Sequence, residues 1–388
     1  MTLCISLVLS FAVRLDAQFV YTAGRINGAN QILGFRITST GALTPVPGSP
    51  FTAGSEPTAI VADPKGKYVY VVNQPTLTEG GNISGFRVGS TGELSPVPGS
   101  PFGRSYYGNP TVDVNGKFVF VTILSVNNDP EVPPAPDWVA AFRIGPSGSL
   151  EEVPGSPYIT DFNFGPLVTD STGQFLYIGI DDEEPSWAPM PPYIGGFKIE
   201  SNGTLTRLPG WPFATSNVGC MPIALVLDPR GKYVYEFNNV YPTSQGAVAV
   251  YQVAADGALT LVSNSTTVFD WPVGIFTATA DPKAGFVYTA FINADTYSTG
   301  AIGSAKIDAQ GGLKPIVVPP FSADTPYSIA AEPYGKFLYA TYFGSTGLWE
   351  YQIAADGSLT PIPGSPVGLN SPWGAIAIVP AGVDRNAQ

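Results

Sequence analysis

The sequence predicts an all-β fold: a seven-bladed β-propeller with four antiparallel strands in each blade. An aromatic–Val/Leu–aromatic triplet occurs seven times, from "FVY" at Phe19 to "FLY" at Phe337, at intervals of about 53 residues, and periods of this length indicate stacked supersecondary units. Glycine and proline number 44 and 39 among 388 residues. Because helices tolerate neither residue well, this composition favours short strands and turns.

Four strand-like runs make up each unit, and the second unit shows them best. They lie at 58–64, 67–73, 82–88 and 94–102, with Gly, Pro and Asp in the turns between them. Four short strands repeated in seven units are typical of a β-propeller, in which each unit forms one blade.

The two ends of the chain predict how the ring closes. The chain enters partway through a unit, at the second-strand sequence "QFVYTAG" (18–24), and it ends with "PWGAIAIVP" (372–380), which matches the first strand "PTAIVADP" (57–64). We expect the C-terminal strand to pair with the N-terminal blade, because this pairing removes the open edge of the ring.

A proline-rich phrase returns in five units. It reads "TPVPGSPF" at 44–51, and related phrases end at positions 102, 158, 213 and 367. We expect the phrase on the outermost strand of a blade, where no ladder bond needs the missing proline N–H. Its final aromatic residue should pack between blades. The "DPxGK" sequences at 63–67 and 228–232 should form turns.

Composition excludes several classes of function. The formal net charge of −12 makes nucleic acid an unsuitable partner, because such a surface repels phosphate backbones. Histidine is absent, which removes the usual general base and the commonest metal ligand. Two cysteines, Cys4 and Cys220, provide neither a disulfide framework nor a thiolate cluster. We therefore predict no metal and no cofactor.

The N-terminal segment, residues 1–17, resembles a signal peptide. Its apolar run at 3–13 is too short to span a bilayer but suits a secretory core followed by cleavage after Ala17. No basic segment precedes the run, which leaves open a truncated start. We predict a secreted or periplasmic monomer without a membrane span, in which residues 18–382 form the propeller and 383–388 a tail.

The motifs "DPKGKYVYVVN" (63–73) and "GFRITSTGALTPV" (34–46), with their spacing, resemble the seven-bladed lactonase family, whose namesake is 6-phosphogluconolactonase. "YVVN" also resembles the YVTN repeats of surface-layer propellers. The resemblance covers 18–380 and implies a role in carbohydrate metabolism. The family's Pro-Arg-His motif would fall on Pro222-Ile223-Ala224, and its Asn-Glu on Asn238-Asn239, so its catalytic motifs are missing here.

Candidate site residues are those that the repeat does not explain, on the face where loops surround the channel mouth. Arg25 and Arg104 could clamp a carboxylate or phosphate, or pair with nearby acids. Residues at the same position of successive repeats form a column, and in the column of Glu236 the other second-strand residues are apolar or small. Glu236 therefore needs a partner or a raised pKa, and is either a general base or the acceptor of a structural hydrogen bond to a neighbouring blade.

Further substrate-binding candidates are amides and aromatics near the same mouth, which suit stacking on a sugar ring. They are Asn109, Asn238, Trp271 and Tyr327. An acidic loop at 181–187 could hold calcium or simply be solvated; it lacks the spacing of an EF-hand.

Two functions remain open. The first is a lactonase-type carboxylic ester hydrolase, with Arg25 and Arg104 holding an acidic group of a sugar lactone and Glu236 activating water. The second is a non-catalytic binding or scaffold propeller for a protein, glycan or cell-wall ligand.

Overall fold

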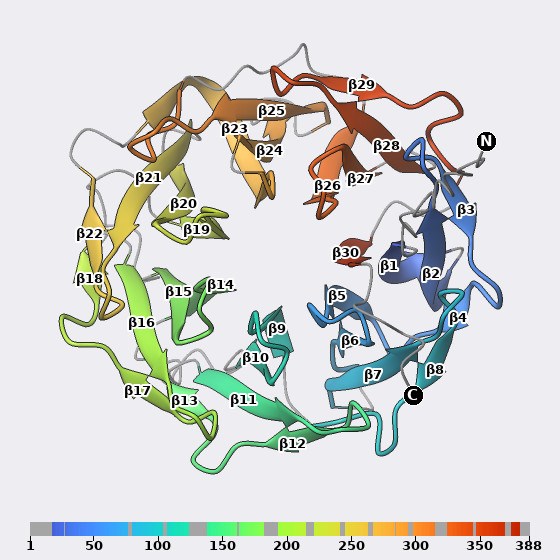
Figure 1. The fold of residues 1–388 in the computed structure, drawn as a ribbon, viewed down its shortest axis with the longest axis horizontal. Helices are drawn as coiled ribbons and strands as arrows, with labels where there is room; N and C mark the ends of the chain where they lie inside the picture. Colours follow the sequence, from blue (N-terminus) through green and yellow to red (C-terminus); the bar gives the residue numbers. More distant parts are fainter. Residues whose placement is uncertain are drawn as a thin grey trace, which may run out of the picture.

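A computed structural model describes residues 18–26, 28–76, 80–103, 107–123, 138–160, 163–181, 193–214, 221–240, 245–262, 267–283, 285–293, 298–314, 324–343, 347–368 and 374–380. Its named elements are all β-strands, arranged as seven blades around a central axis (Figure 1). This confirms the predicted fold. The proposed signal peptide and C-terminal tail lie outside the described residues. Within them, no helix has the length and apolarity needed to cross a membrane.

Blades 1 to 3 use the chain as far as residue 159 together with its last strand. Blade 1 contains β30 (Ala375–Val379), β1 (Phe19–Ile26), β2 (Ala29–Ile37), β3 (Leu43–Pro45) and β4 (Phe51–Thr52); blade 2 contains β5 (Pro57–Ala62), β6 (Tyr68–Asn73), β7 (Asn82–Val88) and β8 (Leu94–Pro96); blade 3 contains β9 (Tyr107–Val112), β10 (Phe118–Ile123), β11 (Trp138–Ile144), β12 (Leu150–Glu152) and β13 (Tyr158–Ile159).

Blades 4 to 7 follow in chain order. Blade 4 contains β14 (Asn163–Thr169), β15 (Phe175–Asp181), β16 (Tyr193–Ile199), β17 (Leu205–Arg207) and β18 (Phe213–Ala214); blade 5 contains β19 (Met221–Leu227), β20 (Tyr233–Val240), β21 (Gln245–Val253) and β22 (Leu259–Leu261); blade 6 contains β23 (Thr267–Ala280), β24 (Phe286–Asn293) and β25 (Gly300–Lys306); blade 7 contains β26 (Thr325–Ala331), β27 (Phe337–Phe343), β28 (Leu348–Ile353) and β29 (Leu359–Pro361).

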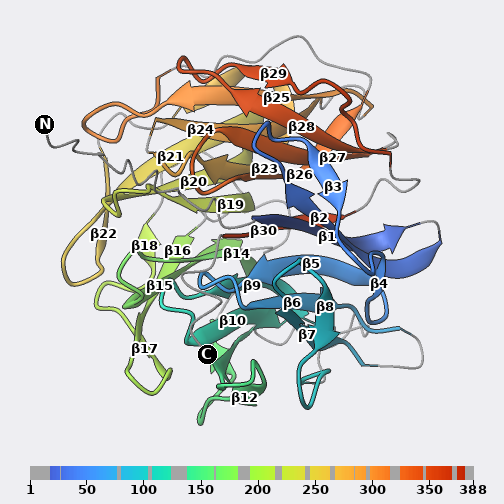
Figure 2. The ribbon, with the colours of Figure 1, turned by 45° about the vertical axis from the view of Figure 1, so that its right-hand side comes forward.

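Closure of the ring follows the prediction. β1 pairs antiparallel with β2 on one side and with β30 on the other, in a register that runs from Phe19 opposite Val379 to Ala23 opposite Ala375. The two ends of the chain therefore share blade 1, where β30 lies beside β1 (Figure 1). The oblique view in Figure 2 shows the same pair with β5 on one side and β26 on the other.

Blades 5 and 6 are joined by one long strand. The first part of β23 pairs with β21 of blade 5, where Val268 lies opposite Ala247, and the second part pairs with β24, where Val273 lies opposite Asn293. The outer strand of blade 5 thus runs directly into the inner strand of blade 6.

The proline-rich phrase divides the outer strand. In blade 1, β3 and β4 both pair with β2, and the residues between them leave the ladder in a turn with a cis Ser49–Pro50 peptide. The Ser49 hydroxyl accepts a hydrogen bond from Gly34 N at 3.0 Å, so the backbone N–H released by the turn keeps a partner. Serines at 100, 156 and 365 repeat this bond in their own blades. The aromatic that ends the phrase is buried at Phe102 and Phe213.

The hydrophobic core lies in the seams between blades. Each seam places the first aromatic of a second strand against a glycine in the outer turn of the next blade. At the seam of blades 2 and 3, a Cβ on Gly148 would stand 2.4 Å from the Tyr68 ring, and this glycine has φ +85°. Only glycine meets both demands at low cost. Tyr70 fastens the seam by donating its hydroxyl to Gly148 O at 2.9 Å.

Candidate active site at the channel

Seven innermost strands surround the channel: β30, β5, β9, β14, β19, β23 and β26 (Figure 1). Several of them carry a β-bulge near the start. The register shifts between Pro57 and Ala59, between Pro222 and Ala224, and between Pro326 and Ser328. A bulge leaves one extra residue and redirects its side chain, so these positions present side chains that the ladder does not dictate.

Glu236 is held in the seam between blades 4 and 5. It lies on β20, opposite Leu225 of β19 and Ala249 of β21, and both of these residues belong to the apolar cluster that joins the two blades. Its side chain is completely buried. Tyr251 donates its hydroxyl to Glu236 Oε2 at 2.8 Å. The partner therefore comes from the same blade rather than from a neighbouring one.

Burial dominates the electrostatics of this carboxyl group. Loss of solvation raises the pKa of Glu236 from its ordinary value of 4.5 to about 7, although the hydrogen bond from Tyr251 and the neighbouring Asn238 amide favour the ionised form. The second oxygen, Oε1, has no hydrogen-bond partner among the described residues. Glu236 thus combines a pKa near neutrality with one uncommitted oxygen.

Asn238 lies two residues further along β20 and is also completely buried. Neither its Nδ2 nor its Oδ1 has a regular hydrogen-bond partner within the described part of the chain. Asn239 differs, because its amide accepts from Ile275 N at 2.8 Å and donates to Ile275 O at 3.3 Å, which ties blade 5 to β23. Buried polar atoms are nearly always paired, so an Asn238 amide whose contact among the described residues is the Glu236 carboxyl group marks this pair as a candidate functional position.

Arg25 lies near the end of β1 with 64% of its side chain exposed. Its guanidinium approaches the Glu56 carboxylate at 3.9 Å, and its Nε donates to Gly28 O at 3.5 Å. Blades 1 and 5 stand on opposite sides of the ring (Figure 1). The structure therefore does not bring Arg25 beside Glu236, and its substrate-binding role stays a prediction. Arg104 lies outside the described residues.

The other predicted contact residues come from three further strands. Asn109, on β9, donates its amide to Gly165 O of blade 4 at 3.3 Å. The backbone of Trp271 belongs to β23, but its side chain lies outside the described part. Tyr327 is the bulge residue of β26, and burial raises its pKa. Most of the loops around the channel mouth, including the acidic loop from residue 182, lie outside the described residues.

Tyr327 belongs to an aromatic cluster that the sequence did not reveal. Its ring centroid lies 4.8 Å from that of Phe343 and 6.3 Å from that of Phe276, and the last two are 5.3 Å apart. All three rings keep partial exposure. Such a cluster joins blades 6 and 7 and offers apolar faces suited to the C–H side of a sugar ring.

Phe276 could have been found by counting from the turn. In blades 2, 5 and 7, the acidic residue that opens the first hairpin turn lies six residues after a proline, which is Pro57, Pro222 or Pro326. In blade 6 the acidic residue is Asp281, and the residue six positions before it is Ile275. The observed register agrees, because the bulge of blade 6 falls between Ile275 and Thr277. Phe276 therefore occupies the position that Tyr327 has in blade 7.

Within the residues that the structure describes, no group of three or more Cys, Asp or Glu side chains is placed to hold a metal ion.

The fold is that of a seven-bladed β-propeller. A family model described as "Lactonase, 7-bladed beta-propeller" matches residues 11–105. The match and the fold confirm the resemblance that the repeat motifs predicted. A comparison with curated proteins finds no similar sequence.

Solved structures give the same fold over nearly the whole chain. A periplasmic gluconolactonase of Pseudomonas aeruginosa is 16% identical with a TM-score of 0.70, covering 94% of this chain and 99% of its own. A protein of Bacteroides fragilis, proposed to be a 6-phosphogluconolactonase, is 18% identical with a TM-score of 0.68, covering 94% and 98%. A protein of Bacteroides uniformis with the same proposed activity is 16% identical with a TM-score of 0.69, covering 94% and 100%.

Proposed function

We propose that the protein hydrolyses a sugar lactone or a related cyclic ester at the channel mouth, with Glu236 as the general base. One observation carries the proposal: a buried carboxyl group with a pKa of about 7 has one oxygen without a regular hydrogen bond among the described residues and lies beside the Asn238 amide. A general base works best when its pKa lies near the operating pH, and this chain has no histidine to supply one.

The reaction needs one proton transfer in each direction. Glu236 Oε1 removes a proton from a water molecule as the water oxygen attacks the lactone carbonyl carbon. The carbonyl oxygen becomes an oxyanion, for which we assign the Asn238 Nδ2 as hydrogen-bond donor. When the ring C–O bond breaks, the proton held by Glu236 passes to the departing alkoxide, which gives a hydroxy acid. Tyr251 holds Oε2 and fixes the orientation of the carboxyl group.

Substrate binding falls to the aromatic cluster in this proposal. Phe276, Tyr327 and Phe343 would stack on the apolar face of the sugar ring, while Asn109 and Trp271 add contacts from neighbouring strands. Glu236 is completely buried, so its water must enter the seam between blades 4 and 5. Arg25 belongs to blade 1, across the ring from blade 5, so the predicted binding of an acidic group by Arg25 and Arg104 is a prediction separate from this mechanism.

Export fits this function. The apolar run at 3–13 resembles a secretory signal, and one structural neighbour is a periplasmic gluconolactonase. We therefore propose a secreted or periplasmic location.

A non-catalytic binding propeller is the second candidate. It is favoured by the complete burial of Glu236 and its bond to Tyr251, which together suit a structural role. In that case the aromatic cluster would bind a protein, glycan or cell-wall ligand without chemistry.

Hydrolysis of a lactone panel separates the two candidates. The panel contains gluconolactone, its 6-phosphate and an aliphatic lactone, tested with wild type and Glu236→Gln. Glu350→Gln is a matched control, because Glu350 is also a buried carboxyl group but serves blade closure by accepting from Leu43 N at 2.7 Å. Catalysis by Glu236 predicts turnover in wild type, a loss of at least about 100-fold in Glu236→Gln, as is typical of a removed general base, and little loss in Glu350→Gln. Equal rates in all three proteins would exclude Glu236.

A further inference from the structure

A basic groove lies on the face of the ring that carries the first hairpin turns, away from the loops of the channel mouth. It has a volume of about 470 Å³ and lies where blades 2, 3 and 4 meet. Lys65 and Lys67 line it from the turn of blade 2, and Lys117 and Arg143 line it from blade 3. Four of the chain's 18 basic residues therefore surround one groove in a protein of net charge −12.

The lysine side chains of this groove form no ion pair in the described part of the chain, although the Asp63 carboxylate attracts Lys65 and Lys67 electrostatically. Ion pairs among the described residues join Arg25 to Glu56, Lys198 to Glu200 and Arg230 to Asp228, so none involves the groove. Within the same residues, no hydrogen bond is found from the ammonium groups of the three groove lysines. Four like charges placed near a single acid repel one another, and a bound anion would relieve this cost.

The single acid in the lining, Asp63, holds the backbone of the turn. Asp63 is buried, and its carboxylate accepts from Lys65 N and Lys67 N at 3.1 Å each. It shapes the turn that presents the two lysines. With four basic groups against this one acid, the lining keeps a net positive charge of about three.

The walls of the groove are fixed by contacts across the seam. Tyr68 donates its hydroxyl to Pro146 O at 2.8 Å, and Arg143 donates to Asn202 O of blade 4 at 3.0 Å. The Lys65 side chain crosses from blade 2 to blade 3, where its Cδ lies 3.6 Å from the point at which a Cβ would stand on Gly116. Such preorganisation lowers the entropy lost when a ligand binds.

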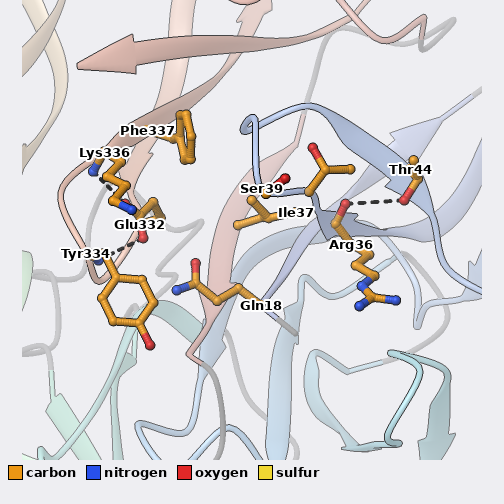
Figure 3. Close-up of a pocket in the computed structure, with 10 residues that line it drawn as sticks. Gln18, Arg36, Ile37, Ser39, Thr44, Glu332, Tyr334, Lys336 and Phe337 are labelled. Carbon is orange, nitrogen blue, oxygen red and sulfur yellow. Dashed lines mark hydrogen bonds between the residues drawn. The ribbon is translucent and has the colours of Figure 1, made fainter. Parts of the chain in front are cut away.

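An equivalent groove at the seam of blades 7 and 1 serves as an internal comparison. Its volume is about 440 Å³, and Figure 3 shows Tyr334 and Lys336 on one wall and Arg36 on the other, with Gln18 between them. By position in the repeat, Tyr334 corresponds to Lys65, Lys336 to Lys67, Arg36 to Arg143 and Gln18 to Lys117. The fold thus accepts Tyr and Gln where the groove of blades 2 and 3 has lysines.

We propose that the groove between blades 2 and 3 binds a small polyanion with two or more phosphate or carboxylate groups, about the size of a phosphorylated or carboxylated monosaccharide. The volume falls in the range of small-molecule sites. Ammonium and guanidinium groups bind both kinds of anion through charge-assisted hydrogen bonds, and several anionic groups on one ligand match the four separate cations. This site is separate from the proposed catalytic one.

Calorimetric titration of the full chain at low ionic strength tests the proposal, with pyrophosphate as the phosphate probe and citrate as the carboxylate probe. The variant Lys65→Tyr/Lys117→Gln installs the residues of the equivalent groove. Lys232→Gln is the control, because it removes one exposed lysine from the turn of blade 5, at a position where blade 4 carries Gln174. We expect wild type to bind at least one probe, the double variant to bind it at least tenfold more weakly, and the control to change the affinity less than twofold.

The two probes also decide the ligand chemistry. Preference for pyrophosphate identifies a phosphate site, and preference for citrate a carboxylate site. The proposal is overturned if wild type binds neither probe, or if the double variant and Lys232→Gln bind equally well, which would indicate general attraction. Lys117→Gln alone is the second variant should the double one lose its fold, and circular dichroism checks each protein.

Discussion

Replacing Glu236 by glutamine should make the stability of the protein less dependent on pH. In the folded chain, burial raises the pKa of Glu236 from 4.5 to about 7, whereas in the unfolded chain the group is solvated. The difference corresponds to about 3 kcal/mol of preference for the neutral form in the folded state. Because the side chain is completely buried, solvent does not screen this value.

The sign follows from proton linkage. Between pH 4.5 and 7 the folded state holds a proton that the unfolded state has released, so the free energy of unfolding falls as the pH rises. The contribution of Glu236 is fully present below pH 4.5 and is lost once the pH exceeds about 7. The amide side chain of the Glu236→Gln variant has no proton to lose, and its contribution should stay constant.

Urea unfolding of wild type and Glu236→Gln at pH 5, 6, 7 and 8 measures this effect. The variant should gain about 2.5 kcal/mol relative to wild type between pH 5 and pH 8, because part of the effect lies below pH 5. Glu200→Gln is the control, since this exposed carboxylate pairs with Lys198 on the surface and should change stability by less than about 0.5 kcal/mol at any pH. A wild-type curve parallel to that of Glu236→Gln would refute the argument that burial controls this group.

Two further changes test the hydrogen bonds around the ring. Tyr251→Phe removes the donor to Glu236 Oε2 and should raise the pH at which Glu236 ionises by about one pH unit. This pH is measured, with and without Tyr251→Phe, as the midpoint of the pH-dependent stability difference between the protein with Glu236 and the same protein with Glu236→Gln. An unchanged midpoint would contradict the prediction. Tyr339→Phe removes the bond to Gly41 O at 2.8 Å, which fastens blade 7 to blade 1, and should lower the free energy of unfolding by about 1 kcal/mol. Tyr288→Phe is its matched control, because that hydroxyl has no partner among the described residues, and equal losses in the two variants would show that the bond contributes nothing.

The fold could be read from the sequence because every seam repeats the same packing. Each second strand places an aromatic ring against a turn glycine of the next blade, as Tyr68 does with Gly148, so both residues must recur with the blade. The split of the outer strand could not be read in this way. It depends on Ser49 Oγ replacing a backbone acceptor, and a serine in a proline-rich phrase gives no sign of that role.

The candidate site was predictable only where a residue departs from its column. Glu236 stood out because a carboxyl group among apolar equivalents needs a special environment, and its complete burial agrees. Asn238 and Asn239 are both asparagines, and only the structure shows that the Asn239 amide is bonded to the Ile275 backbone whereas the Asn238 amide lies beside the Glu236 carboxyl group. Phe276 and Phe343 were missed because aromatic residues are common on strands.

Arg25 and Glu236 belong to blades that are far apart in the ring, because Arg25 lies on β1 of blade 1 and Glu236 on β20 of blade 5. A closed ring of seven blades places blades 1 and 5 on opposite sides, so residues of these blades cannot share a small substrate through direct contact without crossing the channel (Figure 1). The same ring places Glu236 within one or two blades of the aromatic cluster that joins blades 6 and 7.

Columns also explain why the basic groove was not apparent from single residues. Lys67 and Lys117 each recur at the same turn position in other blades, so each looks like a repeated surface lysine. What differs is their combination with Lys65 and Arg143 at one seam. A groove draws on the turns of two blades and on a third strand, so its charge depends on residues about 53 positions apart that no single repeat contains. In a propeller, therefore, a site made by a break in one column is visible in the alignment of repeats, whereas a site made by the meeting of ordinary columns appears only when the blades are placed side by side.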